Sequence, residues 1–241
     1  MSALGDFVSR RAEILSRIGD AAARGGRGPG DVEVVAVTKT VPTDRIRAAY
    51  DAGFRHFGEN RVQEREAKAV ALRDLGGAGF GYGATWHLVG PLQSNKASRA
   101  AHSFDVIETV DSLALARRLD VIEYGELRSG VPFRCYLQVN VDGDPAKSGF
   151  RAADLERDLA EVLSFPGLAV EGLMTVGRLV DKPEAARPTF SALRQLSERL
   201  RAAFSDLGPG LSMGMSEDYP VAVEEGATLV RIGRAIFGER H

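Results

Sequence analysis

The run Val34-Val35-Ala36-Val37-Thr38-Lys39 decides how the fold of this chain is interpreted. Its first four residues are apolar and do not alternate with polar ones, which is typical of a parallel strand covered on both faces. The polar pair Thr38-Lys39 then stands where the strand ends. This run therefore predicts a strand of a parallel sheet that is buried on both faces.

The rest of the chain repeats this alternation of strand and helix. Strand-like runs begin near residues 33, 56, 86, 105, 133, 169, 211 and 228. Runs with helical periodicity include 2–24, 43–51, 61–75, 112–124, 152–163 and 188–204. About eight strand–helix units predict an α/β fold, a (β/α)8 TIM barrel, with the helix at 2–24 as an N-terminal addition. A doubly wound open sheet has the same alternation, and the sequence does not separate the two.

Composition and charge limit the classes of partner. Of 241 residues, 44% are hydrophobic, and the net charge is −2, so nothing indicates a surface for nucleic acid or an anionic membrane. No linker rich in Pro, Gly or Ser divides the chain, so we expect one domain over residues 1–241. The single cysteine, Cys135, cannot form an internal disulfide. No signal segment or membrane span is visible, which indicates a cytoplasmic protein.

Polar residues that follow the predicted strands are the candidates for a functional site. In a TIM barrel the active site lies at the C-terminal ends of the strands. The candidates are Lys39 after the first strand, Asn60 after the second, Ser216 after the seventh, and Arg231, Gly233 and Arg234 in or after the eighth. The four histidines show no metal-ligand spacing, so we expect no metal site. One of them, His87 beside Trp86, is typical of a core histidine.

Lys39 and the loops after the last two strands together predict a particular chemistry. A lysine at the tip of a buried strand is poorly solvated, which lowers the pKa of its amine, and a neutral amine can attack an aldehyde. Phosphate sites in this fold come from the loops after strands seven and eight. There, Ser216 offers a hydroxyl, and Gly233-Arg234 opens a short helix at 235–237 whose first amides favour an anion. A lysine beside a phosphate site indicates pyridoxal 5'-phosphate (PLP).

Each candidate also has a simpler interpretation. Lys39 can be a noncovalent ligand for a phosphate or carboxylate, as in a barrel enzyme that acts on a phosphorylated metabolite. Ser216 and Asn60 can each cap a following helix. Arg231 can pair with a carboxylate inside the barrel. Gly233 can be only a tight turn.

Seven segments in register resemble one family closely. They are VAVTK (35–39), FGENRVQE (57–64), WHLVGPLQSNK (86–96), KSGF (147–150), GLM (172–174), SMGMS (212–216) and VRIGRAIFG (230–238). Together they resemble the pyridoxal phosphate homeostasis protein family (YggS/PROSC type) over residues 34–238. The resemblance implies a single barrel like the N-terminal domain of alanine racemase.

The resemblance also implies roles for the candidate residues. It implies that Lys39 holds PLP as an internal aldimine, and that Ser216 and the backbone at Gly233-Arg234 hold the phosphate. It places Arg231 against the pyridine nitrogen and Asn60 beside the cofactor. Arginine stays protonated, so Arg231 can donate a hydrogen bond to that nitrogen but cannot protonate it, which makes the ring a poorer electron sink.

The function implied by the resemblance is to bind PLP, to limit free aldehyde and to influence vitamin B6 and the balance of amino and keto acids. Racemases of this fold take a second base from an additional domain, and this chain ends at His241. We therefore expect no catalytic turnover and a monomer, with PLP-dependent apoenzymes as partners that receive PLP. The alternative is a weak PLP-dependent amino-acid racemase.

Overall fold

Eight parallel strands close into a barrel in the order β1 to β8, and β8 pairs back to β1. The computed structural model describes residues 3–76, 83–123, 125, 130–177 and 180–239. The strands are β1 (Glu33–Val37), β2 (His56–Glu59), β3 (Thr85–Leu88), β4 (Val106–Val110), β5 (Phe133–Gln138), β6 (Leu168–Met174), β7 (Gly210–Ser212) and β8 (Leu229–Ile232). The closed barrel confirms the predicted TIM fold over the open sheet.

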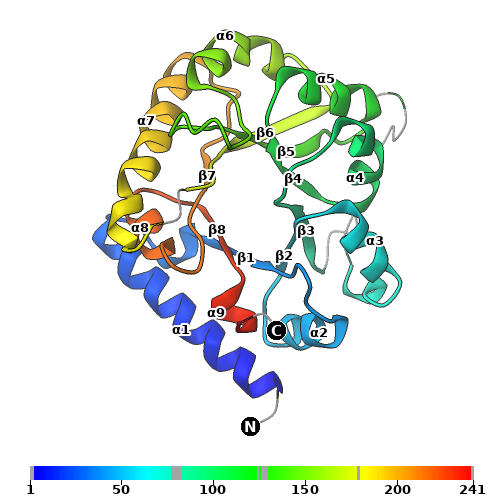
Figure 1. Ribbon diagram of the computed structural model, residues 1–241, viewed down its shortest axis with the longest axis vertical. Helices are drawn as coiled ribbons and strands as arrows, with labels where there is room; N and C mark the ends of the chain where they lie inside the picture. The colour runs from blue at the N-terminus through cyan, green and yellow to red at the C-terminus, as the bar shows by residue number, and fades with distance from the viewer. Residues whose placement is uncertain (1–2, 77–82, 124, 126–129, 178–179, 240–241) are drawn as a thin grey trace.

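Helices surround this barrel (Figure 1). They are α1 (Ala3–Arg24), α2 (Thr43–Asp51), α3 (Val62–Ala69), α4 (Ala97–Ser103), α5 (Leu113–Ile122), α6 (Ala152–Leu163), α7 (Arg187–Ala203), α8 (Tyr219–Glu224) and α9 (Arg234–Phe237). Short 3-10 turns cover Pro29–Asp31, Arg73–Leu75, Ser94–Lys96 and Pro183–Ala186. The predicted N-terminal helix is α1, which precedes the barrel and packs on its outside against α2, α8 and α9.

Most of these elements begin where the sequence predicts them. All eight strands start within one residue of the predicted positions. The helix predicted over 61–75 is shorter, because α3 ends at Ala69 and only a 3-10 turn follows. The predicted helices do not include α4, whose sequence ASRAAHS has buried alanines in place of a stripe of large apolar side chains.

The main core lies between the barrel and the helices, where Trp86, Phe57 and Phe190 are fully buried. A second, smaller group is formed by Val106, Tyr136 and Met174. Cys135 belongs to the main core, and burial raises the pKa of its thiol to about 12, so it stays protonated. This confirms its interpretation as a small buried residue.

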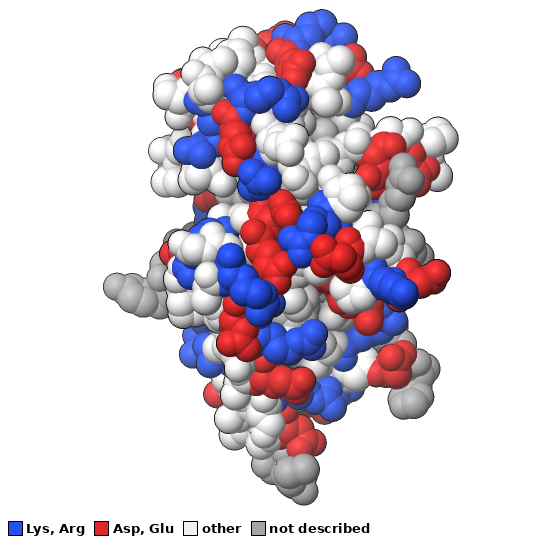
Figure 2. Space-filling view, turned by 90° about the vertical axis from the view of Figure 1, so that its left-hand side faces the viewer, with Lys and Arg blue, Asp and Glu red and all other residues white. Residues whose placement is uncertain are grey.

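Charged side chains of both signs alternate over the face that Figure 2 shows. Arg187 at the start of α7 pairs with Glu224, the last residue of α8, and with its C-cap Glu225, and Arg24 at the end of α1 also pairs with Glu224. These pairs join α1 and α7 to α8 across the surface, where each is worth about 1 kcal/mol or less. Within the described part of the chain, no helix combines the length and apolarity that a membrane span requires.

Candidate cofactor-binding site

Lys39 lies in a turn immediately after β1, and its side chain is half-buried. The amide of Val41 donates to the carbonyl of Thr38 at 2.9 Å, which closes the turn around Lys39. The next residue, Thr40, has φ 64°, a left-handed conformation that a β-branched residue rarely adopts. Backbone outliers of this kind cluster at functional sites because the surrounding structure has to hold them. The end of β1 is therefore a constrained position and not an ordinary loop.

A buried polar cluster holds the residue before Lys39 in place. Lys68 of α3 donates from Nζ to the carbonyl of Thr38 at 2.8 Å and to Oε1 of Glu59 at 2.7 Å. The hydroxyl of Thr38 donates to the same Glu59 oxygen at 2.7 Å. Glu59 ends β2 and is fully buried. The cluster thus joins the ends of β1 and β2 and fixes the backbone from which the Lys39 side chain projects.

The carboxyl group of this cluster titrates near neutral pH. Burial raises the pKa of Glu59 to about 7, while the charge of Lys68 and the hydrogen bonds from Lys68 and Thr38 act in the opposite direction. Proton uptake by Glu59 weakens its attraction for Lys68, so the support under Lys39 depends on pH around neutrality. Sequence reasoning did not identify Lys68, whose only visible signal is its helical spacing from Glu64.

Asn60 follows β2 and packs against the loop after β3. A Cβ placed on Gly90 would lie 2.2 Å from the carbonyl oxygen of Asn60, so the two backbones touch and only glycine fits. The helix-cap interpretation of Asn60 is wrong, because α3 begins at Val62 and its N-cap is Arg61. Asn60 is half-buried at the C-terminal end of the barrel, where the sequence predicts it.

The loops after β7 and β8 meet at Ser216. The amide of Ala235, in the first turn of α9, donates to the Ser216 hydroxyl oxygen at 3.3 Å. The helix-cap interpretation of Ser216 is also wrong: α8 begins at Tyr219 with Asp218 as its N-cap. A hydroxyl that lies at the N-terminus of a helix suits an anion, because both groups donate hydrogen bonds to it.

Gly233 is the N-cap of α9, with φ −111° and ψ −71°. A Cβ at this position would lie 3.5 Å from the carbonyl oxygen of Val37, an ordinary contact, so neither the backbone nor the space requires glycine. The tight-turn interpretation therefore has no support in the geometry. The side chain of Arg234 pairs with that of Glu217 at 3.0 Å.

Arg231 is almost fully buried. It donates from Nη2 to the carbonyl of Thr175 at 2.7 Å and from Nη1 to the hydroxyl of Ser212, and Oε2 of Glu108 lies 3.8 Å from Nη1. Burial lowers the pKa of Arg231, and the charges of Glu108 and Asp218 oppose that shift. Arg231 thus has the barrel carboxylate that its structural interpretation requires, at the end of the barrel where Lys39 also lies.

His87 is a satisfied core histidine, as predicted. Its Nδ1 lies 2.7 Å from Oε1 of Glu108, and its Nε2 lies 2.9 Å from Nδ1 of His56. Sequence reasoning missed Glu108, although one charged residue within the apolar run Val106–Val110 was a visible signal. No set of three or more metal-ligating side chains occurs within the described ranges.

The residues at this end of the barrel fit PLP in their chemistry. The aldehyde of PLP needs an amine, which Lys39 offers. The phosphate needs hydrogen-bond donors and space, which the Ser216 hydroxyl beside a helix N-terminus and Gly233, without a side chain, offer. The pyridine ring needs a polar partner, which the buried cation Arg231 offers. Since β1 and β8 are neighbours in the barrel, the amine and the loop after β8 lie side by side.

The chain is similar to known proteins over nearly its whole length. A family model described as alanine racemase, N-terminal domain, matches residues 21–241. The pyridoxal phosphate homeostasis protein of Aquifex aeolicus is 38% identical over 231 residues, which cover 96% of this chain and 97% of that protein. The chain belongs to the pyridoxal phosphate homeostasis protein family. This finding confirms the family predicted from the seven sequence segments.

Solved structures agree with that assignment. PipY of Synechococcus elongatus PCC7942, solved with PLP bound, is 40% identical with a TM-score of 0.83, and the match covers 96% of this chain and all of PipY. Alanine racemase from Bartonella henselae is 14% identical with a TM-score of 0.70, and the match covers 98% of this chain but 59% of the racemase. The second likeness concerns the barrel fold alone.

Proposed function

We propose that this protein binds PLP at the C-terminal end of its barrel and serves PLP homeostasis and the balance of amino and keto acids. One observation carries the proposal. Gly233, at the start of α9, lies against Val37, two residues before Lys39, so an amine and an anion-binding loop lie next to each other. PipY, a member of the same family, has been solved with PLP bound, which supports the choice of ligand.

Each residue of the site has a proposed part in holding PLP. Bound PLP supplies an electrophilic aldehyde. Lys39 attaches to it when Nζ forms a C=N bond with the aldehyde carbon and the carbonyl oxygen leaves as water. Ser216 and the backbone amides of Gly233 and Arg234 hold the phosphate.

The ring is held by a residue of β8 and by a residue that follows β2. Arg231 donates to the ring nitrogen, and Asn60 lies beside the ring. The whole chain, residues 1–241, acts as one such domain.

We propose further that the protein has no catalytic turnover of its own. The two hydrogen bonds of Arg231, to Thr175 and Ser212, keep a permanently charged donor at this position. A donor that cannot give up its proton leaves the ring a weak electron sink, which disfavours transamination and decarboxylation. A monomer that passes PLP to apoenzymes is the working form that we propose.

Absorbance and mass spectrometry test the proposal. Purified protein incubated with PLP should develop a visible band that borohydride removes, and the reduced protein should carry one pyridoxyl group on the peptide that contains Lys39. Lys39→Ala should lose both signals, while Lys182→Ala, at an exposed lysine, should keep them.

Two results would contradict the proposal. Colourless protein in saturating PLP would favour a noncovalent barrel enzyme that acts on a phosphorylated metabolite. Sustained conversion of L-alanine to D-alanine would show a racemase.

A further inference from the structure

A chain of polar side chains crosses the interior of the barrel below the proposed PLP site. We call it the barrel network; its members are Glu33, His56, His87, Glu108, Ser212 and Arg231. Strands β3 and β4 are not neighbours of β7 and β8, so side chains that join them have to meet inside the barrel. A TIM barrel interior is normally filled by branched apolar residues, so a polar network there requires a reason.

Glu108 is the centre of the barrel network and is fully buried. Burial alone raises the pKa of Glu108, but the hydrogen bond and charge of His87, the charge of Arg231 and the hydrogen bond of Ser212 outweigh it and hold the pKa below its ordinary range. An ionised carboxylate only accepts hydrogen bonds. The hydroxyl of Ser212 therefore donates to Glu108 at 2.6 Å, and its oxygen is left to accept from Arg231.

Because it donates to Glu108 and accepts from Arg231, the Ser212 hydroxyl bridges a buried anion and a buried cation. The remaining groups that face the pair are His87 from β3, the phenol of Tyr136 from β5 and, near Arg231, Asp218. Glu108 lies 3.8 Å from Arg231, within ion-pair distance.

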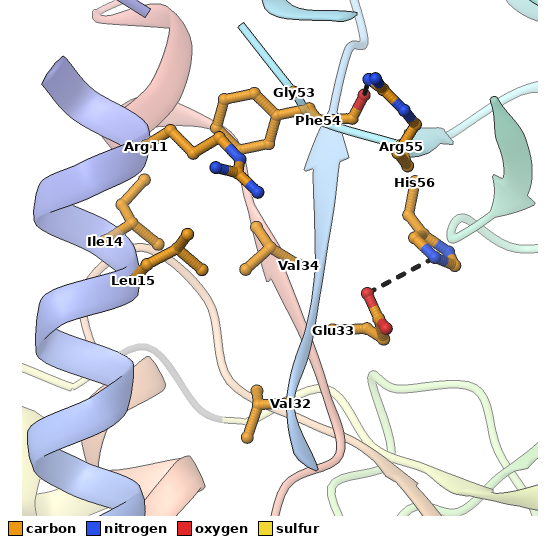
Figure 3. Close-up of a pocket in the computed structure, with 10 residues that line it drawn as sticks. All are labelled: Arg11, Ile14, Leu15, Val32, Glu33, Val34, Gly53, Phe54, Arg55 and His56. Carbon is orange, nitrogen blue, oxygen red and sulfur yellow. Dashed lines mark hydrogen bonds and ion pairs between the residues drawn. The ribbon is translucent and has the colours of Figure 1, made fainter. Parts of the chain in front are cut away.

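The other end of the barrel network reaches a surface cleft between α1 and the first residues of β1 and β2. Figure 3 shows His56 and Glu33 on the wall of this cleft, with Nε2 of His56 3.5 Å from Oε2 of Glu33. Burial, together with the charges of His87 and Arg134, lowers the pKa of His56 to about 4, so this ring stays neutral. A neutral ring ties His87 to the cleft without adding charge.

Stability alone does not account for the buried pair. A buried ion pair costs desolvation free energy that its attraction often does not repay, and apolar residues of similar volume are frequently as stable. Interior positions filled by Val, Ile or Leu would make an ordinary barrel core. What the pair does achieve is to orient one guanidinium group, because Arg231 is held from Ser212 on one side and from Thr175 on the other.

We propose that Glu108 is a positioning residue for the cofactor site: through Ser212 it orients Arg231 and offsets its charge. The inference rests on the proposed PLP function. Removal of the Glu108 charge should leave a net positive charge below the cofactor ring. That charge favours loss of the proton from the nitrogen that joins Lys39 to the cofactor, and it also attracts anions to the mouth of the barrel.

The test is Glu108→Gln, with Glu171→Gln as the matched control. The glutamine side chain has nearly the same shape as glutamate and can still accept from Ser212, whereas Glu171 of β6 is 28% exposed and pairs with Arg134 of β5. In the PLP-loaded protein, the pH midpoint of the visible band should fall by about one unit in Glu108→Gln, as expected for a unit charge within roughly 10 Å at an effective dielectric constant of about 20. Without PLP, the same variant should bind inorganic phosphate about tenfold more tightly.

The outcomes separate this inference from the proposed function. Wild-type protein that forms no borohydride-fixed adduct on Lys39 contradicts the proposed function. A wild-type adduct combined with an unchanged midpoint and unchanged phosphate affinity in Glu108→Gln overturns the role of Glu108 alone.

If Glu108→Gln does not fold, Ser212→Ala takes its place. It removes the bridge and keeps both charges, so PLP should dissociate about tenfold more readily, as for loss of one hydrogen bond to a charged group. Unchanged retention of PLP in that variant overturns the inference.

Discussion

The variant Gly233→Ala tests whether Gly233 is needed for ligand binding or for stability of the fold. The added methyl group would lie 3.5 Å from the carbonyl oxygen of Val37 and 3.7 Å from the Val37 Cβ, which are ordinary contacts. The φ of −111° is open to alanine. Without PLP, the free energy of unfolding should therefore change by about 1 kcal/mol or less, since the lower entropy of the unfolded chain and the weaker N-cap act in opposite directions.

With PLP the result should be different. If the phosphate is held by the first amides of α9 as proposed, the methyl group would crowd it there. An extra methyl group in a closely packed contact costs about 1–3 kcal/mol, which corresponds to a dissociation constant raised about fivefold to more than a hundredfold. Urea unfolding of the ligand-free protein gives the first quantity, and titration with PLP followed at the visible band gives the second.

Gly214→Ala is the control for a structural glycine. Gly214 has φ 92°, and a Cβ there would lie 2.6 Å from the Cβ of Ala222. This variant should lose stability and PLP binding together, whereas Gly233→Ala should lose binding alone. Unchanged PLP affinity in Gly233→Ala would refute the assignment of the phosphate to the loop after β8.

Three further predictions concern the phosphate and the pH dependence. Ser216→Ala should weaken PLP binding by about 1.5–3 kcal/mol, the value of a hydrogen bond to a charged group, and equal affinity for PLP would contradict this. The pKa of Glu59 is raised to about 7, so the free energy of unfolding that Glu59 contributes is complete below the ordinary carboxyl pKa and is lost as the pH rises through 7. Urea unfolding from pH 5 to 8 should show Glu59→Gln gaining about 3 kcal/mol relative to wild type, and parallel curves would refute it. The pKa of His56 is lowered to about 4, so the free energy of unfolding that His56 contributes is present above pH 6.5 and is lost as the pH falls toward 4. His56→Gln should reduce the acid sensitivity of unfolding by about 3 kcal/mol, and no reduction would contradict the neutral ring.

The positions of the strands could be predicted because each strand carries its own signal. The run from Val34 to Val37 predicts a buried strand even when the strands that pair with it are not known. Closure of the barrel could not be predicted in the same way, since it depends on β8 pairing with β1 across nearly the whole chain. The N-caps of α3 and α8 were missed for a related reason: Asn60 and Ser216 have capping side chains, but the backbone turns into a helix only at later residues.

The residues that follow the strands, and Arg231 within β8, could be predicted as candidates for the site, but the buried partners of Arg231 could not. Lys39, Ser216 and Gly233 follow strands, and the C-terminal ends of all strands in a barrel converge, so their proximity follows from topology. The buried partners are side chains that meet across the interior. The contact of Ser212 with Glu108 joins β7 to β4, and the sequence separation of 104 residues carries no local pattern that would reveal it.

The site lies across the line where the barrel closes, and this position links ligand binding to the fold. In the proposed site, Lys39 follows β1, and the residues proposed to hold the phosphate, Gly233 and Arg234, follow β8 and begin α9. A ligand bound to both sides therefore also ties the first strand to the last. Any ligand that binds only the folded chain stabilises it, by about 4 kcal/mol when its concentration is about a thousand times the dissociation constant. Because that stabilisation requires β1 and β8 to be paired, loss of the phosphate contacts at Ser216 should reduce it while the unliganded barrel keeps its own strand pairing.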